Sequence, residues 1–160
     1  FSFEPLMYEY LEENTKEFSN VTIVKKAVTD VKQTLEMYPN AFNSGSNLVN
    51  YKDMDKLIHQ RYGREESRHS GTELVEVEGV PIDSFNFQNV DLIKIDVEGY
   101  NMPVLKGMIN TLKNNSPVIQ IETHPENHMV GKKTHDFLQK LGYVRYHQSG
   151  RPEDWFYYKG

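Results

Sequence analysis

The chain has 160 residues, enough for one domain with a single hydrophobic core. Its 23 acidic residues outnumber its 18 Lys and Arg residues, and the formal net charge of -5 gives no electrostatic case for binding nucleic acid. The absence of cysteine excludes disulfides, thiolate nucleophiles and cysteine-ligated zinc, and it is compatible with a reducing, cytoplasmic location. No run of ~18 apolar residues is present, so we expect no membrane span.

The first half of the sequence predicts short elements around a long loop region. The chain opens on the apolar strand end FSFEP. Residues 39–72 are rich in polar residues that favour turns, and we expect an insertion-like surface region there. Apolar spacing and β-branched runs predict, in chain order, a helix over 5–18, strands over 21–25 and 33–38, a short helix over 53–62 and an exposed antiparallel strand over 72–82.

The second half predicts a regular alternation of strands and helices. Strands that alternate with helices favour a mostly parallel sheet, whereas the short SGRPE turn requires the last two strands to be antiparallel. We therefore predict an α/β fold. Its elements are a strand over 92–97, a helix over 102–112, a strand over 117–122, a helix over 130–141 that Gly142 ends in the left-handed conformation, and strands over 143–148 and 154–159.

Two carboxylates, Asp96 and Glu98, lie at the end of the apolar strand that begins at Leu92. Acidic groups at the carboxyl end of a buried strand indicate a ligand site in α/β proteins. If the strand stays regular, Lys94 shares a face with both, inside a sheet covered on two sides. A lone buried ammonium is costly, so we expect Lys94 to pair with Asp83 or Glu122 beneath the site.

Eight short motifs stand out along the chain: FEP, AVTD, NSGS, VPIDSF, DLIKIDVEG, VLKG, PVIQIE and LGY. In this order and spacing they resemble the FkbM family of S-adenosylmethionine-dependent methyltransferases, nearly from end to end. IKIDVEG, followed by VLKG and a strand ending in Glu, is the most specific part. The resemblance implies a Rossmann-like class I methyltransferase sheet, mostly parallel with an antiparallel last strand, in a single methyltransferase-like domain over residues 1–160.

The resemblance also implies residues that bind S-adenosylmethionine. Glu4, at the end of a strand, would accept hydrogen bonds from the ribose hydroxyls. Ala27 and Val28 would frame the adenine ring, and Asp30 would accept a hydrogen bond from its amino group. Two plainer interpretations stay open: an acid that complements the dipole at a helix N-terminus, and an ordinary transition from strand to loop.

Asp96 has three interpretations. It is a second partner of Lys94, a ligand of the methionine portion of the cofactor, or the general base that removes the proton of an acceptor hydroxyl. Methyl transfer to an alcohol needs in-line positioning at about 3 to 3.5 Å and removal of that proton, and a carboxylate in the crevice assists both. Glu98 is the neighbouring candidate for catalysis.

The stretch IETHPENH adds two acids and two histidines. His124 is a substrate contact, an alternative base with a near-neutral pKa, or a plain surface residue, and Glu122 is a further candidate base or a wall of the site. Imidazole and carboxylate ligands suit several metals. The Pro and Asn that follow His124 disfavour a regular ligand-bearing helix, however, so we predict no metal site.

The family pattern places a first strand and a glycine-rich loop before FEP, and neither occurs in this sequence. We expect an N-terminally truncated domain with the first strand absent, in which FSFEP pairs directly with LIKID or a missing part completes the sheet. The predicted function is O-methyl transfer from S-adenosylmethionine to a hydroxyl of a sugar, glycan or natural product, a small-molecule or glycan acceptor. The alternatives are a non-catalytic fragment or binding module and, more weakly, a metal-dependent hydrolase.

Overall fold

The computed structural model describes residues 2–3, 6–38, 48–49, 75–97, 99–123, 129–147 and 153–160. The chain divides into two compact units. Unit 1 comprises Phe1–Val28 and Lys32–Val80, and unit 2 comprises Thr29–Val31 and Pro81–Gly160. The predicted helix over 53–62 lies outside the described residues.

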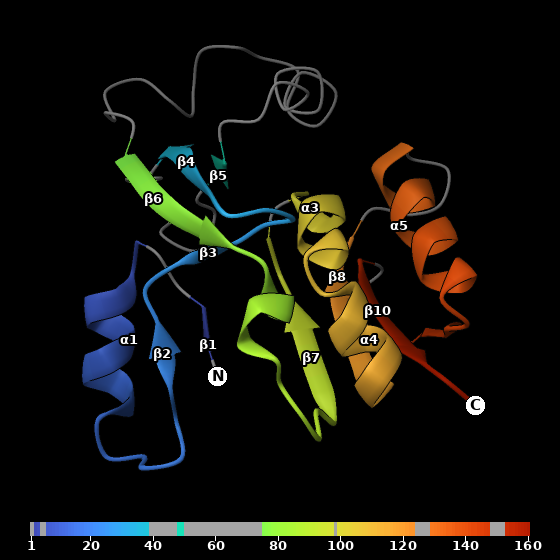
Figure 1. The fold of residues 1–160 in the computed structure, drawn as a ribbon, viewed down its shortest axis with the longest axis horizontal. Helices are drawn as coiled ribbons and strands as arrows, with labels where there is room; N and C mark the ends of the chain where they lie inside the picture. The colour runs from blue at the N-terminus through green and yellow to red at the C-terminus, as the bar shows by residue number, and fades with distance from the viewer. Residues whose placement is uncertain are drawn as a thin grey trace. The chain divides into compact units, whose positions relative to one another are not determined.

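Unit 1 begins with a parallel pair of strands joined through a helix (Figure 1). β1 (Ser2–Phe3) pairs with β2 (Ile23–Val24), and α1 (Tyr8–Thr15) connects them. The predicted helix is thus confirmed in a shorter form. Among the described residues β1 pairs with β2 and β7 (Leu92–Ile95) pairs with β8 (Val118–Glu122), so the alternative in which FSFEP pairs directly with LIKID is wrong.

A second sheet in unit 1 has the strand order β3-β6-β4-β5. β4 (Gln33–Tyr38) and β6 (Val75–Val80) form its antiparallel centre, as the alternating sequences predict. β3 (Ala27–Val28) joins β6 in parallel, and β5 (Leu48–Val49) joins β4 in an antiparallel sense. The expectation that the segment around β5 is loop is therefore wrong at these two residues, because pairing with β4 overrides the local preference of the surrounding Asn and Ser residues for turns.

Unit 2 contains a four-stranded sheet of order β7-β8-β10-β9. β7 (Leu92–Ile95) and β8 (Val118–Glu122) are parallel, whereas β10 (Asp154–Tyr158) is antiparallel to both β8 and β9 (Val144–His147). The antiparallel closing strands are confirmed. The mixed α/β fold is confirmed, whereas the sheets of the described residues are small and mixed, so a mostly parallel Rossmann-like sheet stays a prediction. β7 is an outer strand in this order.

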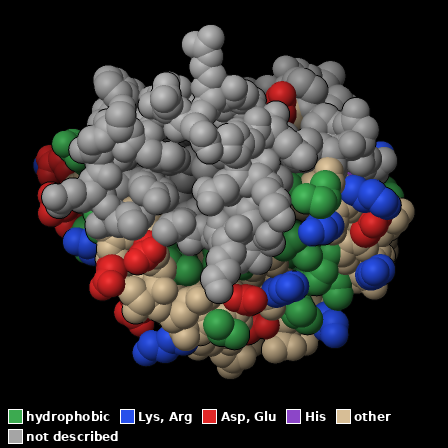
Figure 2. All heavy atoms as spheres, turned by 90° about the horizontal axis from the view of Figure 1, so that it is seen from above, with side chains coloured by type: hydrophobic (Ala, Val, Ile, Leu, Met, Phe, Trp, Pro, Cys, Tyr) green, Lys and Arg blue, Asp and Glu red, His purple; other side chains and the backbone are tan. Residues whose placement is uncertain are grey.

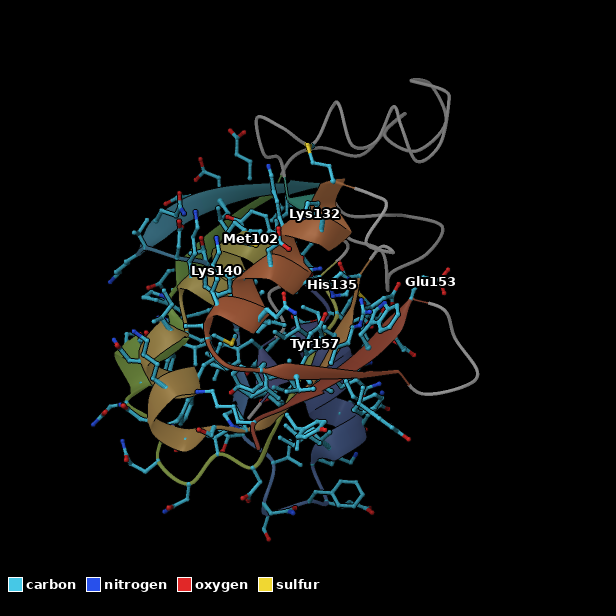
Figure 3. All side chains as sticks on the ribbon, turned by 90° about the vertical axis from the view of Figure 1, so that its right-hand side faces the viewer. Met102, Lys132, His135, Lys140, Glu153 and Tyr157 are labelled. Atoms are coloured by element: carbon cyan, nitrogen blue, oxygen red, sulfur yellow. The ribbon has the colours of Figure 1, made fainter. Side chains whose placement is uncertain are left out.

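Helices cover one face of this sheet (Figure 1). That face carries the fully or almost fully buried core residues Ile95, Ile119, Ile121 and Tyr157. In α5 (Met129–Lys140) Val130, Thr134 and Leu138 are buried, and the ring of His135 makes a hydrogen bond with the Tyr157 hydroxyl. Figure 3 shows His135 on α5 directed toward Tyr157 on β10. Beyond α5, Gly142 has a φ of 86°, which confirms the predicted left-handed cap.

The single helix predicted over 102–112 is instead two helices, α3 (Asn101–Lys106) and α4 (Ile109–Asn115). Gly107 lies at the break. A Cβ atom there would lie 2.1 Å from the Thr29 carbonyl oxygen, so only glycine permits this approach. Asp83, in the 3₁₀ turn Ile82–Phe85, donates its backbone N–H to the Gly107 carbonyl at 2.9 Å. Tertiary contacts with two separate segments therefore interrupt a periodic helical pattern.

The opposite face of the sheet is open along β7. Leu92 is 60% exposed, and Val118 on β8, its partner in the register, is 40% exposed. The expectation that β7 is covered on both sides is therefore wrong. Figure 2 shows acidic and basic side chains together on the described part of the surface. Exposed ion pairs such as Lys132 Nζ to Asp136 Oδ2, 3.0 Å apart, contribute little to stability. Among the helices of the described residues, none has the length and hydropathy needed to cross a membrane.

Candidate functional site

The strands β7 and β8 end side by side. Because they are parallel and Ile95 pairs with Ile121, the next residues, Asp96 and Glu122, occupy neighbouring positions. We call this end of the two strands, with the residues that contact it, the carboxyl edge. Ligands of open α/β sheets bind outside the carboxyl ends of the strands. The structure thus brings together two of the predicted catalytic residues.

Asp96 lies just beyond the end of β7 and pairs with Lys94. The ammonium Nζ is 3.3 Å from Asp96 Oδ2, and the two side chains are 59% and 41% exposed. The prediction that Lys94 is buried with Asp83 or Glu122 is therefore wrong. Because the β7 face is open to solvent, the ammonium stays hydrated and needs no buried partner.

Asp83 has a different role, at the start of α4. Its carboxylate accepts hydrogen bonds from the backbone N–H groups of Asn110 at 2.9 Å and Thr111 at 2.8 Å, and from the Thr111 hydroxyl at 2.8 Å. The two backbone N–H groups are donors that a helix N-terminus leaves without intrahelical partners. The VPIDSF motif therefore contributes a structural cap to unit 2.

A short segment, Thr29–Val31, belongs to unit 2 although it comes from the first half of the chain. We call it the strap. Thr29 is fully buried, and its hydroxyl donates to Asp30 Oδ1 at 3.2 Å and accepts from the Tyr100 hydroxyl at 3.1 Å. The strap therefore connects the predicted adenine contact, Asp30, to the residue that precedes α3. Asp30 itself is exposed.

Two buried polar residues at the carboxyl edge were not predicted. Asn101 is 0% exposed, and its Nδ2 donates to the Glu122 carbonyl at 3.2 Å, which joins α3 to the end of β8. Thr123, the next residue after β8, is 5% exposed. The available signal was an amide at the start of the otherwise apolar helical stripe Asn101, Val104, Leu105 and Met108.

The remaining predicted residues have the following places. Ala27 is buried and Val28 half-buried in β3 of unit 1, where they pair with Gly79 and Val80. Glu4, Glu98 and His124 lie outside the described residues, as do Glu126 and His128 of the IETHPENH stretch. Within the described part of the chain, no group of three or more His, Cys, Asp or Glu side chains is suited to hold a metal ion.

Comparison with known proteins identifies the family. Residues 1–146 match the methyltransferase FkbM domain. No functionally curated protein sequence matches the chain. Its fold is similar to the crystal structure of methyltransferase FkbM from Methylobacillus flagellatus KT, with a TM-score of 0.55 and 14% identity, over 98% of this chain and 35% of that one. This chain therefore spans 35% of the length of that protein. Because the domain match extends over most of its residues, the chain belongs to the FkbM methyltransferase domain family.

Proposed function

We propose that this chain is part of an S-adenosylmethionine-dependent O-methyltransferase that acts on a hydroxyl of a sugar, glycan or natural product. The observation that carries the proposal is the carboxyl edge. There Asp96 directly follows β7, and Glu122 is the last residue of β8, the adjacent parallel strand. In the same unit, the strap carries Asp30 and bonds to Tyr100 beside α3. Family membership supplies the reaction class.

The residues present fit this cofactor chemically. S-adenosylmethionine offers an adenine amino group, ribose hydroxyls and a cationic sulfur, and when bound it supplies the methyl group. Asp30 is an exposed carboxylate that can accept a hydrogen bond from the amino group. Glu4 is proposed to hold the ribose hydroxyls, and Ala27 and Val28 to frame the adenine. Asp96 has the charge to attract a cationic ligand.

Asp96 is also the first candidate for the general base. An acceptor hydroxyl must lose its proton as its oxygen forms the new bond to carbon, and a positioned carboxylate can take that proton. The exposed pair with Lys94 is of the kind that contributes 0 to about 1 kcal/mol, so it leaves Asp96 available for this role. Glu98, Glu122 and His124 are the alternative bases.

The test compares Asp96→Asn with Asp91→Asn. Asp91 precedes β7 and is exposed, so its substitution makes the same charge change at the amino end of the same strand. Calorimetry with S-adenosylhomocysteine measures cofactor-site binding. Transfer of labelled methyl from S-adenosylmethionine to a panel of monosaccharides and glycans measures turnover. We expect Asp96→Asn to lose roughly 10²-fold or more in transfer and Asp91→Asn to be unchanged.

The two readouts separate the roles of Asp96. Lost transfer with unchanged affinity for S-adenosylhomocysteine assigns it as the base. A parallel loss of affinity assigns it to the methionine portion of the cofactor. Failure of the wild-type chain to bind S-adenosylhomocysteine, persisting when an upstream strand and glycine-rich loop are added, contradicts the proposal and favours a binding module. Equal loss of thermal stability in both variants would show that these carboxylates serve the fold.

A further inference from the structure

Two buried side-chain oxygens at the carboxyl edge make no hydrogen bond. Across the residues that the structure describes, Asn101 Oδ1 and Thr123 Oγ1 are enclosed and have no partner. Such groups are rare in native proteins, because leaving one unsatisfied costs about 1 to 3 kcal/mol. Both oxygens lie on residues next to the Glu122–Thr123 peptide. Thr123 is part of this peptide, and Asn101 Nδ2 donates to its Glu122 carbonyl.

The orientation of the Asn101 amide follows from its one hydrogen bond. The Glu122 carbonyl can only accept, so the amide must direct its NH₂ group toward it at 3.2 Å. A flipped amide would place two acceptor oxygens against each other. Asn101 Oδ1 is therefore an acceptor whose missing partner must be a donor.

The position of Thr123 is fixed by a backbone hydrogen bond. Its N–H donates to the Glu153 carbonyl at 3.0 Å, which ties the end of β8 to the residue before β10. Its hydroxyl is thus not needed to hold the chain in place. The hydroxyl can both donate and accept. A ligand hydroxyl could therefore donate to Asn101 Oδ1, and another could bond to Thr123 in either direction.

We propose that Asn101 and Thr123 form a hydroxyl-binding position that holds a hydroxyl-bearing acceptor at the carboxyl edge. This inference rests on the proposed function and extends it, because it names residues that select a hydroxylated substrate. A site built to bond a hydroxyl discriminates strongly against analogues without one, since its own buried polar groups are then left unpaired. A buried water could bond to the same oxygens, and the experiment distinguishes a bound water from a ligand hydroxyl.

The stability arm uses Thr123→Val, which removes the hydroxyl and keeps the shape. An unpartnered hydroxyl contributes nothing to folding, so we expect a melting temperature no lower than that of the wild-type chain. Thr111→Val is the contrasting variant, because the Thr111 hydroxyl donates to Asp83 at 2.8 Å. It should melt several degrees lower. A drop for Thr123→Val as large as that for Thr111→Val would indicate a structural bond, directly or through water, and would overturn the proposal.

The binding arm uses methyl α-D-glucopyranoside as the hydroxyl probe, measured by saturation-transfer NMR, and S-adenosylhomocysteine measured by calorimetry. We expect Thr123→Val to weaken probe binding at least tenfold and to change S-adenosylhomocysteine affinity less than twofold. The matched control is Thr134→Val on α5, whose hydroxyl donates within its own helix to the Val130 carbonyl. It should bind the probe as the wild-type chain does.

Each outcome of the binding arm decides one question. Probe binding that is unchanged in Thr123→Val, or absent in the wild-type chain, overturns the hydroxyl-binding position whatever happens to the cofactor. Absence of S-adenosylhomocysteine binding in the wild-type chain, also after an upstream strand and glycine-rich loop are added, contradicts the proposed methyltransferase instead. In that case the hydroxyl-binding position is still judged by the probe.

Discussion

Asp83 and Asn101 both fix a helix of unit 2 to another part of the chain, but they differ in how fully they are bonded. The Asp83 carboxylate accepts three hydrogen bonds at the start of α4, and both its oxygens are used. Asn101 uses one donor on the Glu122 carbonyl, and its oxygen remains without a partner in the described structure. A residue that serves only the fold is expected to be satisfied within the fold. The contrast therefore separates a structural polar group from one suited to a ligand.

Gly107 contacts both the strap and Asp83, and Gly107→Ala should disturb both contacts at once. The new Cβ would meet the Thr29 carbonyl at 2.1 Å, a backbone atom that cannot rotate away. Moving it would shift the strap on one side and the Asp83 backbone bond on the other. We expect a loss of unfolding free energy on the order of 3 kcal/mol, measured by urea denaturation.

The control for this change is Gly142→Ala, where an added Cβ meets open space and only the positive φ of 86° is unfavourable. That strain should cost about 1 kcal/mol. If the two variants lose equal stability, close packing at Gly107 does not hold the strap.

Asp83→Ala should reduce stability without changing the affinity for ligands. It leaves two backbone N–H groups and the Thr111 hydroxyl without their acceptor, and the expected cost is about 2 kcal/mol. Asp83→Asn, which keeps one acceptor oxygen, should lose less. Thermal melts and S-adenosylhomocysteine calorimetry below the melting point give the two readouts. Weakened binding in the folded variant would contradict a purely structural role.

Tyr143 gives a pH test of another bonded group. Its hydroxyl donates to the Leu112 carbonyl at 3.3 Å, and burial raises its pKa to about 12 from the ordinary 10.0. The unfolded chain therefore ionises first, so this contribution to stability is complete below pH 10 and is lost between about pH 10 and pH 12. Tyr143→Phe should be about 1 kcal/mol less stable at neutral pH. Its deficit should shrink in alkaline denaturation curves, and a constant deficit would contradict the assignment.

Lys94→Met should have the smallest effect. The exposed pair with Asp96 is worth 0 to about 1 kcal/mol, so the melting temperature should hardly change. The variant replaces an ammonium on the open face of β7 while Asp96 remains in place. A loss of several kcal/mol in the free energy of unfolding would support the buried ion pair that the sequence predicted.

The sequence predicted the parts of unit 2 that depend on local pattern. Alternating or continuous apolar runs located β8, β9 and β10, and the spacing from Val130 to Leu138 located α5 and its glycine cap. The position of Asp96 at the end of β7 also followed from pattern, because a strand that ends before a glycine turn delivers its last side chains to an edge. These features need no information from distant residues.

Other features depend on contacts that no local pattern records. The break between α3 and α4 requires the Thr29 carbonyl, more than seventy residues away in the chain, to pack against Gly107. The Thr29 to Tyr100 hydrogen bond likewise spans 71 residues. The exposure of Lys94 follows from which face of β7 is covered, and the unpaired oxygen of Asn101 becomes visible only when every neighbour is known.

The strap has a practical consequence for dividing the protein. A polypeptide of residues 81–160 would contain every strand and helix of unit 2 and would look complete by sequence. It would nevertheless lack Thr29, so the Tyr100 hydroxyl would lose its acceptor and Gly107 would lose the carbonyl against which it packs. Independent production of this half would therefore require a rearranged gene in which the three strap residues are joined to it through a designed linker.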